Sequence, residues 1–311
     1  MTITQLQYVL AVAEHKNFTL AAEKCFVTQP TLSMQIQKIE EELDILIFDR
    51  SKKPIQLTDI GQKIVNQAKN IVNESGRIKD IVEQQKGFIG GEFRLGIIPT
   101  IMPTLLPMFL NNFIKKYPKV KLIIEELNTD EILTRLKNGH LDAAIAATPL
   151  EDEKIKEVVL YFEPFVAYIP AGHSIAAKKE IEVSDLNINE LLLLQDGHCF
   201  RDGVLNLCKT GDLSENGHFQ IQSGSFETLL KLADEGLGTT LLPYLHTLDL
   251  KEKDKSKLRH FKEPKPAREV SLIYPKTELK IHIIDALRST IAGVIKGAVV
   301  FQNVEIISPK K

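Results

Sequence analysis

A long amphipathic helix, predicted for residues 58–87, divides the chain into a short head and a longer body. Mostly apolar residues recur at every third or fourth position, and Thr58 can cap the first turn. A helix with one such seam and no partner nearby in the sequence is expected to pair with a second copy of the chain. We therefore predict a homo-oligomer, either a dimer or a tetramer. The seam comprises Ile60, Ile64, Ala68, Ile71, Ser75, Ile78 and Val82.

The composition is that of an ordinary globular protein. The chain has 311 residues, of which 43% are hydrophobic and 26% charged, enough for two or three domains. The longest purely apolar run, from Tyr8 to Ala13, is far too short to cross a membrane, and polar residues follow Met1 where a signal peptide would be basic and then apolar. We expect a cytoplasmic protein without membrane contact. The net charge of −2 predicts no particular partner.

The head, residues 1–58, is predicted to be an all-α winged helix-turn-helix. Apolar spacing indicates three short helices, and a tight turn at residues 25–27 separates the second from the third. Thr28 is a suitable N-cap for the third helix, with Pro30 in its first turn. Two short apolar segments, 45–48 and 55–57, would form the wing around a basic tip. The third helix leaves polar residues for water or DNA: Gln29, Thr31, Ser33, Gln35 and Lys38.

Charge alone does not identify the head as a DNA-binding module. Residues 1–58 carry six Lys or Arg against seven Asp or Glu, so an ordinary solvated helix face is the alternative. The basic residues do cluster at the wing, however, at Arg50, Lys52 and Lys53. Glutamine can bind adenine through two hydrogen bonds, and threonine offers a methyl group to thymine.

The body shows buried strands alternating with helices, which predicts an α/β fold with a parallel sheet. The first unit has strands at 93–98, 120–126 and 141–147 and helices near 104–116 and 130–138. A second such unit is expected to follow, with strands at 165–169, 191–194, 219–222 and 239–242 and helices after Cys199 and Ser225. A strand at 270–274 and a helix near 280–296 would return to the first unit. Residues 251–257 are predicted to be a solvated loop.

Two of the three cysteines lie at the start and just past the end of one predicted helix. Asp196 and Gly197 favour a turn after the buried segment 191–194, so a helix can begin at Cys199. Backbone N–H groups at a helix start, with the cations His198 and Arg201 beside them, are expected to lower the pKa of the Cys199 thiol. A reactive thiol with Cys208 close in the sequence suggests a redox pair.

Other interpretations of these cysteines are packing and metal binding. Free cysteines are often inert core residues, which is the interpretation we favour for Cys25 beside Phe26 and Val27. A zinc site built from His198, Cys199, Cys208 and His218 lacks the usual ligand spacing. We therefore expect neither a metal nor another cofactor.

Two threonines stand at the carboxyl ends of predicted strands, where ligands bind in parallel α/β sheets. Thr100 follows the strand at 93–98, and Thr129 follows the strand at 120–126. Thr129 precedes Asp130 and Glu131, so it could equally be the N-cap of the next helix.

Two stretches carry a resemblance to a known family. Residues 18–61, FTLAAEKCFVTQPTLSMQIQKIEEELDILIFDRSKKPIQLTDIG, are similar almost position by position to the winged helix-turn-helix of LysR-type transcriptional regulators. The run LLLLQDGHCFRD, with Cys208 nine positions after Cys199, resembles the sensing segment of the peroxide-sensing members of that family. The resemblance implies a head at 1–58, a dimerisation linker helix at 59–88 and a periplasmic-binding-protein-like sensor domain at 89–311. Its lobe I would span 89–163 and 268–302, and lobe II 164–267.

The resemblance also implies a function, that of a regulator rather than an enzyme. Hydrogen peroxide would oxidise Cys199 to a sulfenic acid, which would condense with Cys208, and thiol reductants would reverse the step. Further partners would be promoter DNA and RNA polymerase. The alternatives are a metabolite in the cleft between the lobes, or a thiol peroxidase or disulfide oxidoreductase. The implied peroxide pocket comprises Thr100, Thr129, His198 and Arg268, and the implied DNA contacts are Gln29, Pro30, Thr31, Ser33, Gln35 and, on the wing, Arg50.

Overall fold

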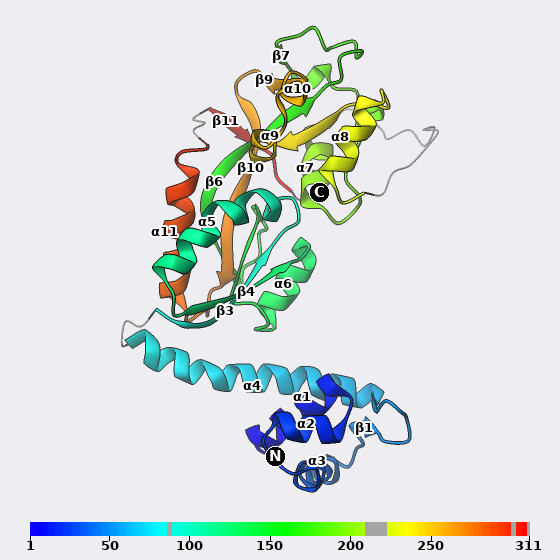
Figure 1. The fold of residues 1–311 in the computed structure, drawn as a ribbon, viewed down its shortest axis with the longest axis vertical. Helices are drawn as coiled ribbons and strands as arrows, with labels where there is room; N and C mark the ends of the chain where they lie inside the picture. The colour runs from blue at the N-terminus through cyan, green and yellow to red at the C-terminus, as the bar shows by residue number, and fades with distance from the viewer. Residues whose placement is uncertain (86–88, 209–222, 300–302, 310–311) are drawn as a thin grey trace. The chain divides into compact units, whose positions relative to one another are not determined.

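The computed structural model describes residues 1–85, 89–208, 223–299 and 303–309. Contacts divide the chain into two compact units, residues 1–86 and 87–311 (Figure 1). Each unit has a hydrophobic core of its own, one in the first unit and two in the second. The winged helix-turn-helix and the two-lobed α/β body predicted from the sequence are both confirmed.

The first unit is built from four helices and a small wing. Its helices are α1 (Ile3–His15), α2 (Phe18–Lys24), α3 (Gln29–Leu43) and α4 (Asp59–Gln85). Asn17 caps α2, and Thr28 caps α3 as predicted. The wing pairs β1 (Phe48–Asp49) with β2 (Gln56–Leu57) antiparallel.

The long helix α4 packs partly within its own chain. Val65 and Ala68 are buried in the core of the first unit, where α4 contacts α1. The expectation that this seam lacks a partner nearby is therefore wrong for the first turns. Ile78, further along the seam, is 64% exposed and stays available to a second copy.

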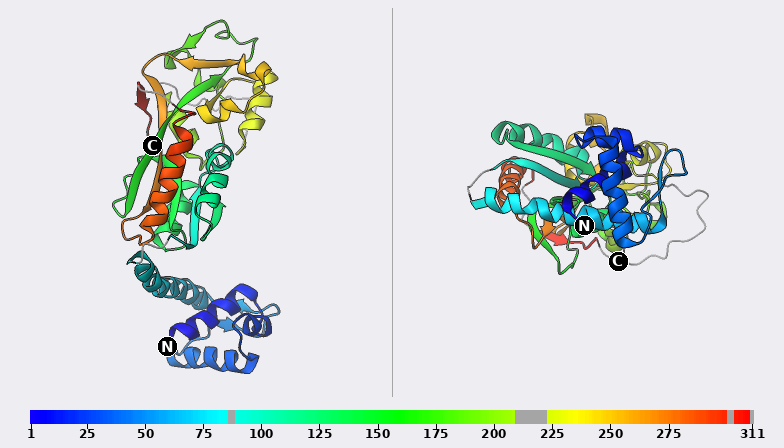
Figure 2. Two further views of the ribbon diagram at one scale, coloured as in Figure 1. Left: turned by 60° about the vertical axis from the view of Figure 1, so that its left-hand side comes forward. Right: turned by 90° about the horizontal axis from the view of Figure 1, so that it is seen from below.

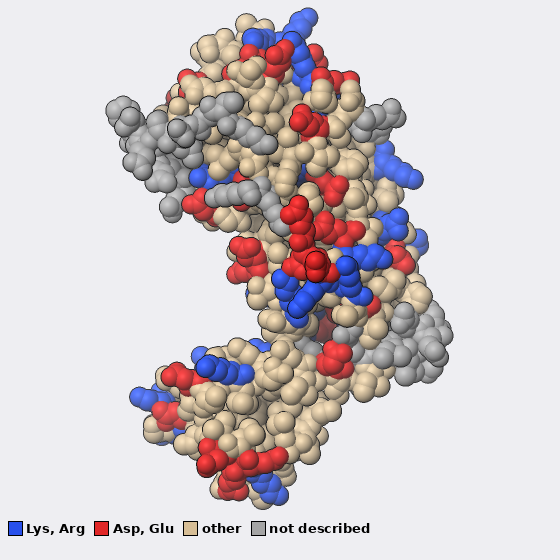
Figure 3. Space-filling view, turned by 180° about the vertical axis from the view of Figure 1, so that it is seen from behind, with Lys and Arg blue, Asp and Glu red and all other residues tan. Residues whose placement is uncertain are grey.

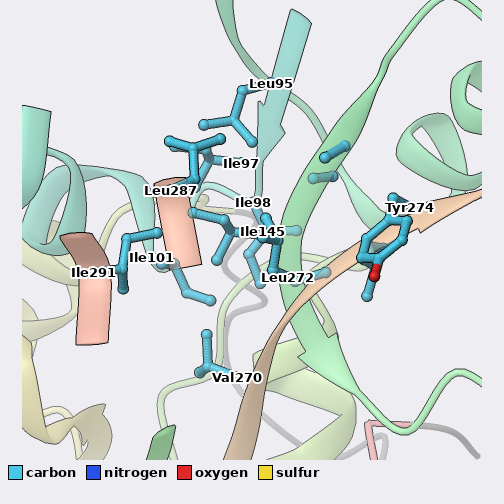
Figure 4. Packing of buried hydrophobic residues seen from close by; sticks show 14 of the residues in the cluster. Leu95, Ile97, Ile98, Ile101, Ile145, Val270, Leu272, Tyr274, Leu287 and Ile291 are labelled. Carbon is cyan, nitrogen blue, oxygen red and sulfur yellow. The ribbon is translucent and has the colours of Figure 1, made fainter. Parts of the chain in front are cut away.

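Lobe I of the second unit follows the predicted alternation. The strands β3 (Gly91–Ile97), β4 (Val120–Glu126) and β5 (Ala143–Thr148) are parallel in the order β4-β3-β5. The helices are α5 (Met102–Lys116), α6 (Thr129–Lys137) and α11 (Ile281–Ile295). Aliphatic side chains from the strands and from α11 interlock in the core (Figure 4).

Two long strands pass from one lobe to the other. β6 (Ile155–Tyr168) and β10 (Lys265–Pro275) pair antiparallel, and β10 also pairs with β5. α11 lies along these strands and contacts β6 (Figure 2). The short strand β11 (Val304–Ile306) adds to β10 in parallel.

Lobe II is built around the C-terminal part of β6, where β8 (Thr240–Pro243) and β9 (Leu258–Phe261) pair with residues 165–168. It also contains β7 (Glu180–Ile181), α7 (Cys199–Leu207), α8 (Phe226–Asp234), α9 (Tyr244–Leu248) and α10 (Glu252–Lys255), with 3-10 turns at Val183–Asp185 and Ile188–Glu190. α7 and α8 pack over a core that includes Phe165, Phe200, Phe226 and Leu241.

Several expectations for lobe II were wrong. β8 and β9 both pair with β6 antiparallel, because the chain returns along β6 rather than crossing over a helix each time. The predicted strand at 191–194 makes only an isolated bridge from Leu191 to Thr239. The predicted loop at 251–257 contains the helical turn α10. The strand predicted at 219–222 lies outside the described residues.

Candidate functional site

Cys199 is the first residue of α7, and the local sequence explains why the helix begins there. Gly197 has a φ of 88°, a left-handed conformation that suits glycine, and forms the predicted turn with Asp196. His198 is extended and occupies the N-cap position, although its side chain makes no capping hydrogen bond. The helix start predicted at Cys199 is therefore confirmed.

The Cys199 side chain joins the two lobes. α7 belongs to lobe II, but Cys199 is only 8% exposed and packs in the hydrophobic cluster of lobe I. Burial raises the pKa of its thiol, while the Arg268 guanidinium, the Thr129 hydroxyl and the Ala147 backbone favour the thiolate and oppose this effect. The groups that hold the thiol thus come from β10, α6 and β5.

The expectation that His198 and Arg201 lower the pKa of this thiol was wrong. Arg201 forms an ion pair with Asp196 at 3.0 Å and donates to the Leu194 carbonyl at 3.1 Å. Burial lowers the pKa of His198, so its neutral imidazole is favoured. The cation that acts on Cys199 is instead Arg268, which is remote in the sequence, and desolvation outweighs it.

Arg268 sits in a buried network that fixes its guanidinium. Its Nε and one terminal nitrogen donate to the same Glu163 carboxylate oxygen at 2.9 and 2.7 Å. The other terminal nitrogen donates to the Thr100 hydroxyl at 2.8 Å, and the first also donates to the Thr100 carbonyl at 3.1 Å. The guanidinium carbon lies 5.2 Å from the centre of the Phe200 ring.

This network leaves specific donors for a ligand beside the thiol. A guanidinium has five N–H donors, and the four hydrogen bonds to Glu163 and Thr100 leave one N–H of Arg268 without a partner among the described residues. Because the Thr100 oxygen accepts from Arg268, its own proton remains available to donate. One guanidinium N–H and one hydroxyl can therefore be offered to a small polar ligand.

Thr129 contributes a second hydroxyl. Asn128, not Thr129, is the N-cap of α6, where it forms a capping box with Glu131, so the capping interpretation of Thr129 was wrong. The Thr129 hydroxyl is buried and has no oxygen or nitrogen hydrogen-bond partner among the described residues. It nevertheless lies close enough to Cys199 to lower the pKa of that thiol. A hydroxyl without a firm partner beside a buried thiol can accept or donate to an oxygen of a ligand.

His198 stands at the edge of this group of residues. Its ring is half-buried, and the negative charge of Glu126 at the end of β4 raises its pKa, which opposes the larger effect of burial. A Cβ on Gly224 would lie 3.2 Å from the His198 Nε2, so a larger residue there would press on the ring. Of the four predicted pocket residues, the structure places Thr129 and Arg268 beside the Cys199 thiol, Thr100 on the Arg268 guanidinium, and His198 next to Cys199 in the chain.

Cys208 lies at the opposite end of α7. It is the C-cap residue, is 7% exposed and, like Cys199 and Cys25, is a free thiol. Burial raises the pKa of the Cys208 thiol. Nine steps of helix at 1.5 Å separate the two Cα atoms by about 13.5 Å, whereas a disulfide tolerates roughly 7 Å. Cys25 is half-buried, and desolvation raises the pKa of its thiol as well.

Within the described ranges, no three His, Cys, Asp or Glu side chains come together in a way that could hold a metal ion. His218, one of the residues considered for zinc, lies outside these ranges. None of the helices in these ranges is both long enough and apolar enough to span a bilayer.

The predicted DNA contacts on α3 and the wing differ in how free they are. Gln29 and Pro30 are exposed, whereas Thr31 is hydrogen-bonded to Thr28 at 2.8 Å. The Gln35 carbonyl accepts from Gln5 at 3.0 Å, so only part of its amide is available. On the face drawn in Figure 3, basic and acidic side chains adjoin one another without forming a single basic surface.

Arg50 has a structural role within the first unit. It pairs with the buried Glu40 carboxylate at 2.8 Å, lies 3.5 Å from the Ser33 hydroxyl and sits over the Phe18 ring. Glu40 also accepts from the backbone N–H groups of Ile47 and Phe48. Arg50 thus connects the wing to α3, and its 40% exposed side chain retains donors for a phosphate.

Glu163, Phe200 and Tyr161 belong to the site but were not among the site residues predicted from the sequence. Glu163 is 1% exposed and holds Arg268, and Phe200 packs against that guanidinium. Tyr161 is buried beside both charges, its hydroxyl has no hydrogen-bond partner in the part of the chain that the structure describes, and burial raises its pKa well above the usual value. A signal for Glu163 did exist, because it is the single charged residue in the apolar run 158–169.

Fold and site together define a DNA-binding regulator with a two-lobed sensor unit. Residues 3–62 match the family model "Bacterial regulatory helix-turn-helix protein, lysR family", and residues 86–294 match "LysR substrate binding domain". The chain belongs to the LysR family of transcriptional regulators and is of the OxyR type, a regulator and not an enzyme.

Three similar proteins illustrate this relationship. The DNA-binding transcriptional dual regulator OxyR of Escherichia coli K12 is 34% identical over 307 residues, which cover 96% of this chain and 100% of that protein. A full-length OxyR variant from Pseudomonas aeruginosa has a TM-score of 0.73 and 34% identity, covering 94% and 98% of the two chains. A Corynebacterium glutamicum OxyR variant described as H2O2-bound has a TM-score of 0.64 and 27% identity, covering 98% of each.

Proposed function

We propose that the chain senses hydrogen peroxide by reversible oxidation of Cys199 and transmits the change to promoter DNA. The observation that carries the proposal is the buried Cys199 thiol, held between Thr129 and Arg268, with the Thr100 hydroxyl fixed on Arg268. A small polar oxidant fits this setting because the donors are few and water is largely excluded. The H2O2-bound OxyR from Corynebacterium glutamicum supports the choice of ligand.

The first chemical step is the transfer of one peroxide oxygen to sulfur. The Cys199 thiolate attacks one oxygen, the O–O bond breaks, and the departing hydroxide takes up a proton and leaves as water. Sulfur is oxidised by two electrons and peroxide is reduced. The free N–H of Arg268 and the hydroxyls of Thr100 and Thr129 stabilise the negative charge that develops on the leaving oxygen.

The second step joins Cys199 to Cys208. The Cys208 thiol displaces the sulfenic oxygen of Cys199 as water, which forms the disulfide. Because about two and a half turns of helix separate the two residues, the helix must unfold at least in part. Refolding would remove Phe200 from Arg268 and break the 2.9 Å hydrogen bond from Asn206 to the Ser308 carbonyl. A dithiol reductant reverses the step by thiol–disulfide exchange.

The unfolding of α7 provides the link to DNA. Cys199 is the residue by which α7 is inserted into lobe I, so its removal alters the contact between the lobes. In a dimer or tetramer paired through α4, such a change can alter the spacing of the heads on promoter DNA and their access to RNA polymerase. Gln29, Pro30, Thr31, Ser33 and Gln35 would contact the groove.

The test combines thiol counting with DNA binding. Full-length protein is treated with stoichiometric hydrogen peroxide, free thiols are counted by mass spectrometry, and a mobility shift on promoter DNA is measured in parallel. Wild type and Cys25→Ser should each lose two thiols and change their DNA complex, whereas Cys199→Ser should do neither. Equal responses in wild type and Cys199→Ser would refute the proposal. Rapid catalytic turnover of peroxide with no effect on DNA would favour a thiol peroxidase.

A further inference from the structure

Glu163 and Arg268 form a buried ion pair that is held by several hydrogen bonds. The two residues face each other across the β6–β10 ladder, and their side chains are 1% and 4% exposed. One carboxylate oxygen of Glu163 accepts two hydrogen bonds from Arg268, at 2.9 and 2.7 Å. The other oxygen accepts the backbone N–H of Leu245 at 2.9 Å, at the start of α9. Neither the carboxylate nor the guanidinium can rotate without breaking a buried hydrogen bond.

This arrangement determines where the one free N–H of Arg268 points. Both donors on the Glu163 side and two on the Thr100 side are occupied, and the Phe200 ring lies 5.2 Å from the guanidinium carbon. The remaining N–H of Arg268 therefore points in one direction. The Glu163 carboxylate fixes that direction without contacting the Cys199 thiol. Arginine without Glu163 would retain the contacts to Thr100 but could pivot about them.

The same carboxylate compensates the charge of Arg268. Cys199 is faced by Arg268 from β10, Thr129 from α6, the Ala147 backbone from β5 and Asp202 from its own helix. Two further titratable groups lie close by, the neutral His198 at the N-cap and the Tyr161 phenol beside Glu163. Among the described residues, Arg268 is the only cation that acts on the thiol. A carboxylate paired with it reduces the stabilisation of the Cys199 thiolate.

We propose that Glu163 is a positioning residue for the peroxide reaction, which holds Arg268 in one orientation and limits its effect on the Cys199 thiol. The inference rests on the proposed peroxide chemistry of Cys199. With Glu163 present, the Cys199 thiol is less ionised than it would be beside Arg268 alone. Glu163 also orients the remaining N–H of Arg268, which we expect to donate to peroxide. Its removal should therefore have opposite effects on a reagent that needs only the thiolate and on peroxide.

Two rates measured on full-length protein separate these effects. Alkylation of Cys199 by iodoacetamide reports the thiolate, and the stopped-flow reaction with hydrogen peroxide reports the thiolate together with its aligned donors. In Glu163→Gln, alkylation below the thiol's pKa should be at least about threefold faster, and its pH profile should shift to lower pH. The ratio of the peroxide rate to the alkylation rate should fall about tenfold or more.

Glu163→Asp separates geometry from charge. It keeps the negative charge but is one methylene shorter, so it cannot reach Arg268 and the Leu245 N–H together. Alkylation should stay within about twofold of wild type while the peroxide rate falls about tenfold. Glu163→Asp also tests the positioning role if Glu163→Gln does not fold. Aspartate keeps a negative charge opposite the buried Arg268 guanidinium, so no buried charge is left uncompensated. The matched control is Glu269→Gln, which removes a carboxylate bonded to Thr148 next to Arg268 and should change neither rate.

A rate ratio equal to that of wild type in both Glu163 variants would overturn the inference, since a merely structural residue lowers stability without changing this ratio. Failure of the proposed peroxide chemistry would give a different result from failure of the Glu163 inference. In that case Cys199 of the wild type would be alkylated but would not react with peroxide.

Discussion

Gly203→Ala tests whether α7 must unfold for the disulfide to form. Gly203 lies in the middle of α7, with ordinary helical backbone and a buried position. A Cβ built there would lie 3.4 Å from the Phe165 Cζ, an ordinary van der Waals contact, so alanine fits. The substitution removes the conformational freedom that makes glycine a poor helix residue. It therefore stabilises only those states in which residue 203 is helical.

The size of the effect follows from helix propensity. Alanine favours a helix interior over glycine by about 0.5–1 kcal/mol. If the disulfide form has lost this part of α7, that free energy stabilises the dithiol form alone. The equilibrium constant for disulfide formation should fall about two- to fivefold, and the reduction potential should become about 10–20 mV more positive. The initial reaction of Cys199 with peroxide should be unchanged, because α7 is intact at that stage.

The assay is a redox titration of full-length protein in glutathione buffers, with the disulfide quantified by mass spectrometry. Stopped-flow measurements follow sulfenic acid formation and the condensation with Cys208 separately. Gly293→Ala is the matched control, because Gly293 is also a helix-interior glycine, in α11, and has no atom within 4 Å of an added Cβ. It should raise the melting temperature of both redox forms and leave the potential unchanged.

Gly203→Ala with the wild-type potential and condensation rate, but a higher melting temperature in both redox forms, would refute the reasoning. That result would mean that residue 203 stays helical in the disulfide form, so the two cysteines would have to meet by another movement.

Three further predictions address the pocket, the pH dependence and the head. Thr129→Val should leave the melting temperature unchanged, because the hydroxyl has no oxygen or nitrogen hydrogen-bond partner among the described residues, yet slow the peroxide reaction about 10- to 100-fold because the contact with the Cys199 thiol is lost. Thr100→Val should lower both, since a buried donor loses its acceptor. Burial lowers the pKa of His246, so the unfolded chain binds the proton more tightly and stability falls as pH drops below 6.5; thermal melts of His246→Gln should show a shallower fall. Gln29→Ala should weaken a specific promoter duplex by about 1–3 kcal/mol in mobility shifts, whereas Arg50→Ala should weaken all duplexes and also lower the melting temperature of the head, since its buried carboxylate partner is left unpaired.

The features that were predicted correctly from the sequence are local, because they depend on residues that are neighbours in the chain. The turn at Asp196–Gly197, the start of α7 at Cys199 and the Thr28 cap of α3 are local features, and all three are present. The alternation in lobe I was predictable for the same reason, since a buried strand and an amphipathic helix have different apolar periods.

What the sequence did not predict depends on partners that are distant in the chain. The direction of the Cys199 pKa shift is set by burial in lobe I, which outweighs the opposing charge of Arg268, and neither effect is visible in the residues around the thiol. The strand directions of lobe II depend on β6 running through both lobes. Glu163 could have been suspected from its apolar surroundings, but its partner could not have been named.

The distance in sequence between the partners has a consequence for protein synthesis. The hydrogen bond from Arg268 to Thr100 spans 168 residues, and Arg268 is added 69 residues after Cys199 (268 − 199 = 69). At about 5–20 residues per second, the ribosome needs roughly 3–14 seconds for that interval. A nascent chain in an oxidising cell therefore carries Cys199 before the strand that shelters it exists. In that interval the Cys199 thiol lacks the burial that it has in the finished molecule, where it is 8% exposed.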